Sequence, residues 1–147
     1  MFTVATRRLR HICNHPTDLV LMIEITAWLG LAWFILKFLP FQQTSILLQP
    51  KVHKREYALS QVEIAKLSRL INVVSRHLPW RSVCFHQGIA AQRILCRLGI
   101  TANLHYGVLK QGDSLIGHVW VTAQGDVVVG GEGVRSCIRF VTFSPLK

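Results

Sequence analysis

The spacing of apolar residues changes once along the chain, at Gly99 and Ile100, and this change constrains the fold more than any other feature. Before it, apolar residues recur every three or four positions, which is the period of a helix packed on one side. After it, they alternate with polar residues, as in a half-buried strand. Helices followed by consecutive strands indicate an α+β fold with an antiparallel sheet.

Two amphipathic helices are predicted before this change. The first begins after Ser60, which has the capping-box spacing with Glu63, and it ends before Pro79. The second extends from about Ser82 to Gly99, a suitable C-terminal cap. The apolar side of this second helix is formed by Cys84, Gly88, Ala91, Leu95 and Leu98.

Four strands are predicted after the change. They are separated by turn sequences at Gln111-Gly112-Asp113 and Gln124-Gly125-Asp126 and by the pair Gly130-Gly131. The expected strands are Ala102–Val108, Ile116–Ala123, Val127–Val129 and Cys137–Phe143.

A further apolar stretch, Leu19–Leu39, is predicted to be helical and is long enough to cross a bilayer. Glu24 and Lys37 within it argue against a membrane span, and no small-residue cleavage site follows Pro40. We therefore expect a buried or docking helix, with membrane contact through residues 19–39 left open as the alternative. The composition changes near Pro50, so we divide the chain into an N-terminal helical segment, 1–50, and a main domain, 51–147.

The composition restricts the partners and cofactors. The chain has 17 Lys and Arg against 7 Asp and Glu, a net charge of +10, which suits an acidic or polyanionic partner. The cations are scattered, however, and no basic recognition helix or aromatic-rich basic strand is present, so we do not expect nucleic-acid binding. The four cysteines form no C-x-x-C pair, so no metal site, disulfide framework or cofactor is predicted.

Cys84 is the best candidate for a nucleophile. It lies in the first turn of a predicted helix, where free amides and the helix dipole favour the thiolate, and Arg81 adds a nearby cation. The alternative is that Cys84 is a small buried side chain on the same stripe as Gly88 and Ala91.

His118, in Gly117-His118-Val119-Trp120, is the candidate base. Imidazole titrates in the range required to take a proton from a thiol and return it to a leaving amine. Trp120 should share the strand face of His118 and shield it. The alternative is an ordinary strand histidine with its hydrogen bonds satisfied.

Together, several segments resemble the transglutaminase-like leader peptidase of lasso-peptide biosynthesis. The resemblance covers most of the chain and is most specific around the cysteine and in the His-x-Trp strand. The segments are Leu78-Pro79-Trp80-Arg81-Ser82-Val83-Cys84, Ala91-Gln92-Arg93-Ile94-Leu95, Leu98-Gly99-Ile100, Leu104-His105-Tyr106-Gly107-Val108, Gly117-His118-Val119-Trp120-Val121 and Val127-Val128-Val129-Gly130-Gly131.

The resemblance implies a transglutaminase-like or papain-like cysteine protease core, with a catalytic helix packed on an antiparallel sheet. It implies Cys84 as nucleophile and His118 as base in a cytoplasmic enzyme that removes the leader from a precursor peptide. An asparagine-synthetase-like partner cyclase would then close the macrolactam ring. Because the first 50 residues indicate helix, we expect the leader-recognition protein to be a separate chain, docked through residues 19–39 or through basic residues such as Arg7, Arg8, Lys51, Lys54 and Arg55.

The expected Cys-His-acid triad has two candidate acids, Asp126 and Glu132. The family's orienting Asp follows the histidine strand, but Asp126, at a hairpin tip, lies roughly 17 Å from His118 along that strand. A three-residue turn would place Glu132 opposite His118, whereas a two-residue turn would place Gly131 there. We prefer Glu132, with Asp126 second and no acid as a third option.

Other function classes remain open from the sequence alone. The apolar helix and the missing Asp also suit a membrane-associated, non-catalytic scaffold of a peptide-maturation complex. The net charge leaves a basic nucleic-acid-binding protein as a further alternative. Within the enzyme class, the same residues can transfer the acyl group to an amine instead of water.

Overall fold

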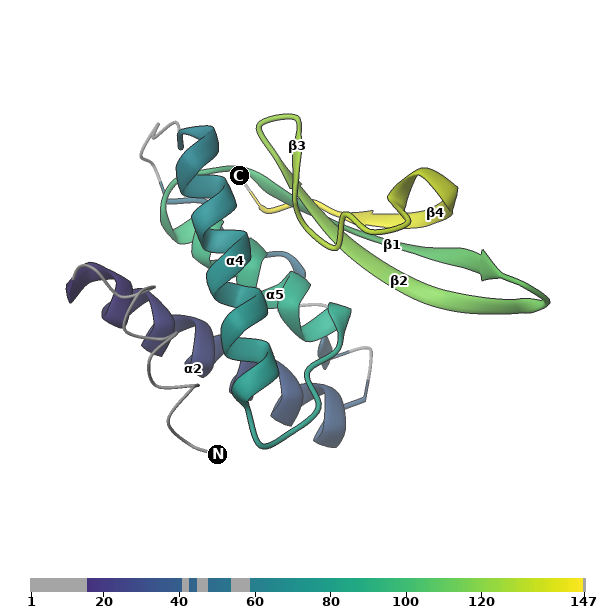
Figure 1. Ribbon diagram of the computed structural model, residues 1–147, viewed down its shortest axis with the longest axis horizontal. Helices are drawn as coiled ribbons and strands as arrows, with labels where there is room; N and C mark the ends of the chain where they lie inside the picture. The colour runs from purple at the N-terminus through teal and green to yellow at the C-terminus, as the bar shows by residue number, and fades with distance from the viewer. Residues whose placement is uncertain (1–15, 41–42, 45–47, 54–58, 147) are drawn as a thin grey trace.

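The computed structural model describes residues 16–40, 43–44, 48–53 and 59–146, and it has the predicted α+β order, with long helices before an antiparallel sheet (Figure 1). In chain order, the elements are α2 (Pro16–Phe38), α4 (Gln61–His77), α5 (Cys84–Arg97), β1 (Ala102–Gln111), β2 (Ser114–Ala123), β3 (Asp126–Val129), the 3-10 helix η1 (Val134–Ser136) and β4 (Cys137–Phe143).

Helix α4 begins at the predicted capping box. The Ser60 hydroxyl accepts a hydrogen bond from the Glu63 amide at 3.3 Å, and the Ser60 amide donates to the Glu63 carboxylate at 2.9 Å. These two bonds satisfy amides that have no partner within the helix. The helix ends at His77, just before Pro79, as the sequence predicts.

Helix α5 begins at Cys84 rather than at Ser82, because Val83 is the N-cap. The Val83 amide donates to Nδ1 of His86 at 3.0 Å. At the other end the chain reverses at Gly99, which has a φ of 84°, as the predicted C-terminal cap requires.

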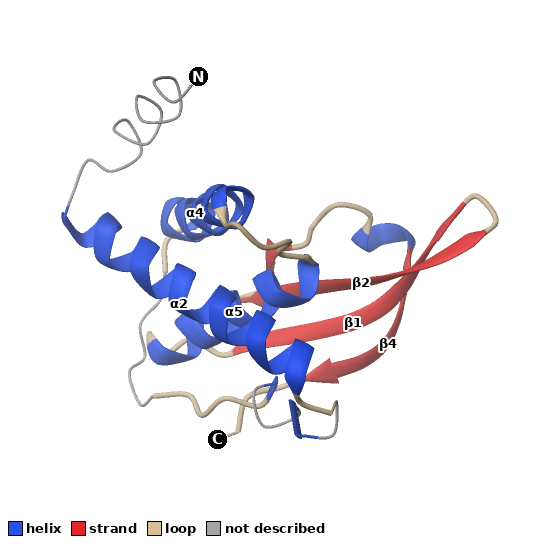
Figure 2. Ribbon diagram, turned by 90° about the horizontal axis from the view of Figure 1, so that it is seen from below, coloured by secondary structure: helices blue, strands red, loops and turns tan. Residues whose placement is uncertain are grey.

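The four strands lie in the order β3-β2-β1-β4, all antiparallel. Helices α2, α4 and α5 lie on one side of this sheet, and the far half of the β1–β2 hairpin extends past them (Figures 1 and 2). Helix α5 approaches the sheet closely at Gly88, where an added Cβ would lie 2.8 Å from Cγ1 of Val119 and 3.3 Å from Cδ1 of Leu104. Only glycine allows this approach without displacing its neighbours.

Helix α2 packs into the same core as α4 and α5 through its buried residues Ile25, Leu29 and Ala32. Ion pairs from Asp18 to Lys66 of α4 and from Glu24 to Arg97 of α5 fix it further; the second is bidentate, at 2.5 and 2.6 Å. By length and composition α2 is also the one described helix that could cross a membrane. Large apolar side chains remain exposed on it, namely Leu19, Val20, Ile23, Leu31, Phe34 and Phe38.

The connection from β3 to β4 covers the sheet face that the helices leave open. Because β3 and β4 are opposite edges, the chain between them has to cross one face of the sheet. An added Cβ on Gly130 would lie 2.9 Å from Cα of Trp120, and one on Gly133 would lie 3.1 Å from Cδ2 of Leu109. Trp120 and Leu109 alternate with residues that face α5, so the connection crosses the opposite face.

His105 is buried on that face. Its Nδ1 and Nε2 atoms bond the hydroxyls of Thr142 at 2.9 Å and Thr122 at 2.8 Å, and its ring stacks on Trp120. Burial, with a smaller contribution from the positive charge of Arg139, lowers the pKa of His105 below its ordinary value of 6.5.

We expect acid to destabilise the protein through His105. As the pH falls through 6.5, the unfolded chain binds a proton that the folded chain resists, so the free energy of unfolding decreases. Urea unfolding at a series of pH values should show this loss, with a smaller slope in His105→Gln. Part of the slope should remain, since burial also lowers the pKa of His86. A wild-type slope in His105→Gln would contradict the prediction.

Candidate active site

Cys84 is the first residue of α5 and is half-buried. The first helical hydrogen bond of α5 runs from the Gln87 amide to the Val83 carbonyl at 3.3 Å. The amides of Cys84, Phe85 and His86 therefore have no backbone acceptor among the described residues. Such amides, together with the helix dipole, form a site that stabilises negative charge.

Contacts with three elements fix the start of α5. The Phe85 ring lies edge-on to Tyr106 of β1, with 6.5 Å between centroids. The Gln87 side chain donates to the Ser75 hydroxyl of α4 at 3.1 Å. With Gly88 against β2, these contacts leave the Cys84 position little freedom.

Two buried hydrogen-bonding groups precede the cysteine without a described partner, Nε1 of Trp80 and Oγ of Ser82. The Trp80 ring packs on Trp33 of α2, with 5.9 Å between centroids. Buried polar atoms without a partner are uncommon, and an indole N–H can only donate. Both residues lie in the segment that joins α4 to α5. Their residue types alone predict no role for them, although both precede Cys84 in the same segment.

His118 lies on β2, opposite Gly107 of β1. Because Val119 faces α5, the side chain of His118 leaves the strand on the other face, where its ring stacks on Trp120 with 6.2 Å between centroids. The predicted sharing of a face by His118 and Trp120 is therefore confirmed.

The His118 ring has one hydrogen bond, from Nε2 to the carbonyl oxygen of Gly130 at 2.8 Å. A carbonyl only accepts, so Nε2 carries the hydrogen and the neutral ring has its lone pair on Nδ1. Nδ1 has no hydrogen-bond partner in the part of the chain that the structure describes. An imidazole in this tautomer can accept a proton at Nδ1.

The register of β3 explains why Gly130 lies there. Ala123 pairs with Asp126, as a two-residue turn requires, but Val121 pairs with Val129, so a bulge adds one residue to β3. The strand then ends, and Gly130, with a φ of 76°, turns the chain.

Neither predicted acid contacts His118. Glu132 is exposed beyond the end of β3, because the turn at Gly130 prevents the ladder from continuing to it. Asp126 lies at the hairpin tip and accepts a hydrogen bond from Gln61 of α4. The contact expected of Glu132 is made instead by the Gly130 carbonyl, and a catalytic role for either acid stays a prediction.

Helix α5 packs on one face of β2, through Gly88 and Val119, whereas the side chain of His118 lies on the other face. The structure therefore places Cys84 and His118 on opposite sides of the same strand. Among the described residues, no hydrogen bond joins the Cys84 thiol to the imidazole. His86, two residues after Cys84, has its Nδ1 occupied by the Val83 amide.

The other cysteines and histidines form no metal site among the described residues. Cys96 is buried, and burial raises the pKa of its thiol. Cys137 is half-buried at the start of β4. Cys13 and His15 lie outside the described residues, as do Arg7, Arg8, Lys54 and Arg55.

Comparison with known proteins gives one family. A family model described as the Transglutaminase-like superfamily matches residues 27–141. The match extends from the middle of α2 into β4 and includes both Cys84 and His118. No curated protein and no solved structure matches the chain.

Gly130→Ala should lower the free energy of unfolding by more than the strain of a left-handed backbone alone would, because the added Cβ also meets β2. A Cβ there would lie 2.3 Å from the Val119 carbonyl oxygen, whereas one on Gly125, which has a φ of 87°, meets no atom within 4 Å. Gly125→Ala should therefore cost only about 1–2 kcal/mol, and Gly130→Ala clearly more. Thermal unfolding of both variants measures the difference; equal losses would mean that residue 130 does not press on β2 in solution.

Proposed function

Because the chain belongs to the transglutaminase-like superfamily, we propose that it is a cysteine peptidase with Cys84 as nucleophile and His118 as base. This superfamily includes cysteine proteases and transglutaminases. The observation that carries the proposal is a cysteine at the free-amide end of α5, the helix that packs on the strand of His118. The imidazole has an unbonded Nδ1 and lies on the other face of that strand.

In the proposed reaction, Nδ1 of His118 takes the Cys84 thiol proton as sulfur attacks the scissile carbonyl. The imidazolium then gives this proton to the leaving amine, and the acyl group remains on sulfur as a thioester. Water, deprotonated by the same Nδ1, hydrolyses the thioester and restores the thiol. Sγ and Nδ1 must come within hydrogen-bonding distance for this, so the imidazole has to leave the sheet face that it occupies here, opposite α5, and reach Cys84 when substrate is bound.

The free amides at the start of α5 suit the oxyanion of this mechanism. The Cys84 amide is fixed to the attacking residue, and the amides of Phe85 and His86 point the same way at the positive end of the helix. Removing one such donor in other enzymes typically costs about 10²–10³ in kcat.

For the substrate, we propose the precursor of a lasso peptide, cleaved between leader and core. The resemblance of the segments around Cys84 and His118 to the leader peptidases supports this choice. Cleavage releases the amine that an asparagine-synthetase-like cyclase needs for macrolactam closure. A separate leader-recognition protein would present the precursor in the cytoplasm, and the exposed apolar side chains of α2 offer it a docking surface.

Cys84→Ala and His118→Ala should each abolish cleavage of the precursor. Loss of the nucleophile leaves no acyl-enzyme, and loss of the base leaves the thiol without a proton acceptor. Liquid chromatography with mass detection of the released core, with the recognition protein present, gives the rate. Cys96→Ala provides the matched control, because Cys96 lies on the same helix but is buried. Full activity in Cys84→Ala would exclude the peptidase.

The same assay separates the candidates for the orienting group. If the Gly130 carbonyl is sufficient, Glu132→Gln and Asp126→Asn should cleave within a few-fold of the wild-type rate. A loss of 10²-fold or more in Glu132→Gln would instead assign the acid of the triad to Glu132.

The alternative function is a non-catalytic scaffold held at a membrane by α2, which the exposed apolar residues of that helix favour. The two functions differ in the reactivity of Cys84. Labelling by a cysteine-directed peptide probe that is faster at Cys84 than at the half-buried Cys137 supports the peptidase. Equal, slow labelling supports the scaffold.

A further inference from the structure

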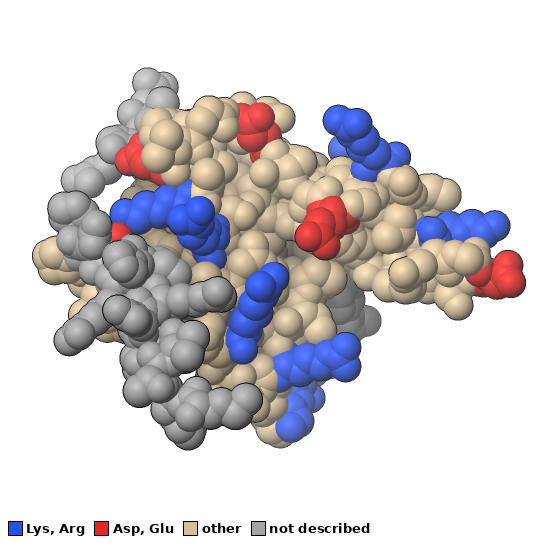
Figure 3. Space-filling model, viewed as in Figure 1, with Lys and Arg blue, Asp and Glu red and all other residues tan. Residues whose placement is uncertain are grey.

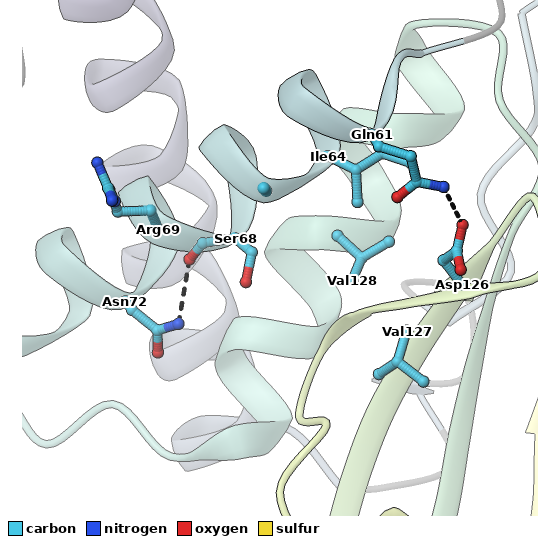
Figure 4. A pocket seen from close by; sticks show the side chains of 9 residues that line it. Gln61, Ile64, Ser68, Arg69, Asn72, Asp126, Val127 and Val128 are labelled. Atoms are coloured by element: carbon cyan, nitrogen blue, oxygen red, sulfur yellow. Dashed lines mark hydrogen bonds between the residues drawn. The ribbon is translucent and has the colours of Figure 1, made fainter.

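A groove of about 410 Å³ lies between helix α4 and strand β3, away from both candidate catalytic side chains (Figure 4). Ile64 of α4 and Val128 of β3 give it an apolar base, and Ser68 and Asn72 add polar groups along the helix wall. Its volume is within the range of sites that hold a ligand or a short peptide segment.

One wall of the groove is an open strand edge. β3 pairs only with β2, and no described strand pairs with its other edge. Asp126, Val127 and Val128 of this strand line the groove, and the side chain of Val127 is 42% exposed. An edge with unpaired amides and carbonyls can accept an extended peptide as an additional strand.

The helix wall carries a positive charge. Arg69 lines the groove and has no ion pair among the described residues. The two acids of α2, Asp18 and Glu24, are paired with Lys66 and Arg97 instead. The one acid in the groove, Asp126, lies at the opposite end and is bonded to Gln61 (Figure 4). Other Lys and Arg side chains are spread over the helical part of the face shown in Figure 3. The free cation therefore favours a peptide with an acidic side chain.

The helix wall of the groove leads to Cys84. Beyond Asn72, the next turn of α4 contains Ser75, whose hydroxyl accepts a hydrogen bond from Gln87 of α5 at 3.1 Å. Gln87 is in the first turn of α5, together with Cys84. The end of the groove near Asn72 is therefore the end near the candidate nucleophile.

The strand wall leads to His118 in the same way. Beyond Val128, β3 ends at Val129, and the next residue, Gly130, accepts the hydrogen bond from the imidazole. A peptide that follows the helix wall in this direction therefore approaches Cys84, whereas the strand wall continues to the other face of the sheet, where the imidazole lies.

We propose that this groove binds an extended, acidic segment of the substrate peptide, which pairs with the open edge of β3 and sets a carboxylate against Arg69. The identification of this peptide as substrate rests on the proposed peptidase function. The binding itself requires neither the thiol nor the imidazole.

Two short fluorescein-labelled peptides test the proposal on the full chain carrying Cys84→Ala, which prevents cleavage. In one, valine alternates with glutamate; in the other, glutamine replaces each glutamate. Fluorescence anisotropy should show tighter binding of the glutamate peptide, and Arg69→Gln should weaken it roughly tenfold, the effect of losing one charge-assisted hydrogen bond. Lys110→Gln, on the exposed hairpin, is the matched control and should leave binding unchanged.

Amide hydrogen exchange locates the bound peptide. Saturating glutamate peptide should slow exchange in residues 126–129 and leave residues 137–143, the other open edge of the sheet, unchanged. Equal binding of the two peptides, equal losses in Arg69→Gln and Lys110→Gln, or protection at 137–143 alone would overturn the proposal.

The proposal for the groove and the proposal of a peptidase can be overturned independently of each other. Probe binding at β3 in a chain that cleaves no precursor would exclude the peptidase and leave the groove as a peptide-binding site. Precursor cleavage without probe binding at β3 would exclude the groove alone.

Discussion

Helix α5 lies so close to the sheet that only a hydrogen atom fits between Gly88 and Val119 of β2. This contact fixes the start of the helix, and so the position of Cys84, relative to the strand that carries His118. The hydrogen bond from Gln87 to Ser75 and the edge-on contact of Phe85 with Tyr106 prevent the helix from sliding or turning on the sheet. A site whose chemistry depends on thiol and imidazole needs this rigidity, because small misplacements slow a reaction severely.

The chain that crosses the open face of the sheet supplies the second constraint. Its first residue, Gly130, can press on β2 because it has no side chain, and its carbonyl then fixes the tautomer of His118. In this arrangement a main-chain group orients the imidazole, a role for which the sequence offered only Glu132 or Asp126. A backbone carbonyl cannot ionise, so this orientation does not depend on the protonation of an acid.

The sequence predicted most of the secondary structure, because apolar spacing and local caps carry that information. The capping box at Ser60, the C-terminal cap at Gly99, the first-turn position of Cys84 and the shared face of His118 and Trp120 agree with the structure. The partner of His118 was not predictable by counting residues, since a bulge in β3 shifts the register by one and a left-handed residue then ends the strand. The groove beside β3 could not be predicted from the sequence, because its two walls are far apart along the chain and meet only by tertiary packing.

The central claim, that Cys84 attacks a peptide carbonyl, can be tested by trapping its covalent intermediate. The full chain is mixed with precursor and recognition protein, quenched in acid within the first turnover, and analysed by intact and peptide mass spectrometry. We expect a fraction of the protein to carry the mass of the leader as a thioester on Cys84, labile to hydroxylamine and absent in Cys84→Ala. Precursor cleavage without an adduct on Cys84, or with the adduct on another residue, would contradict the claim.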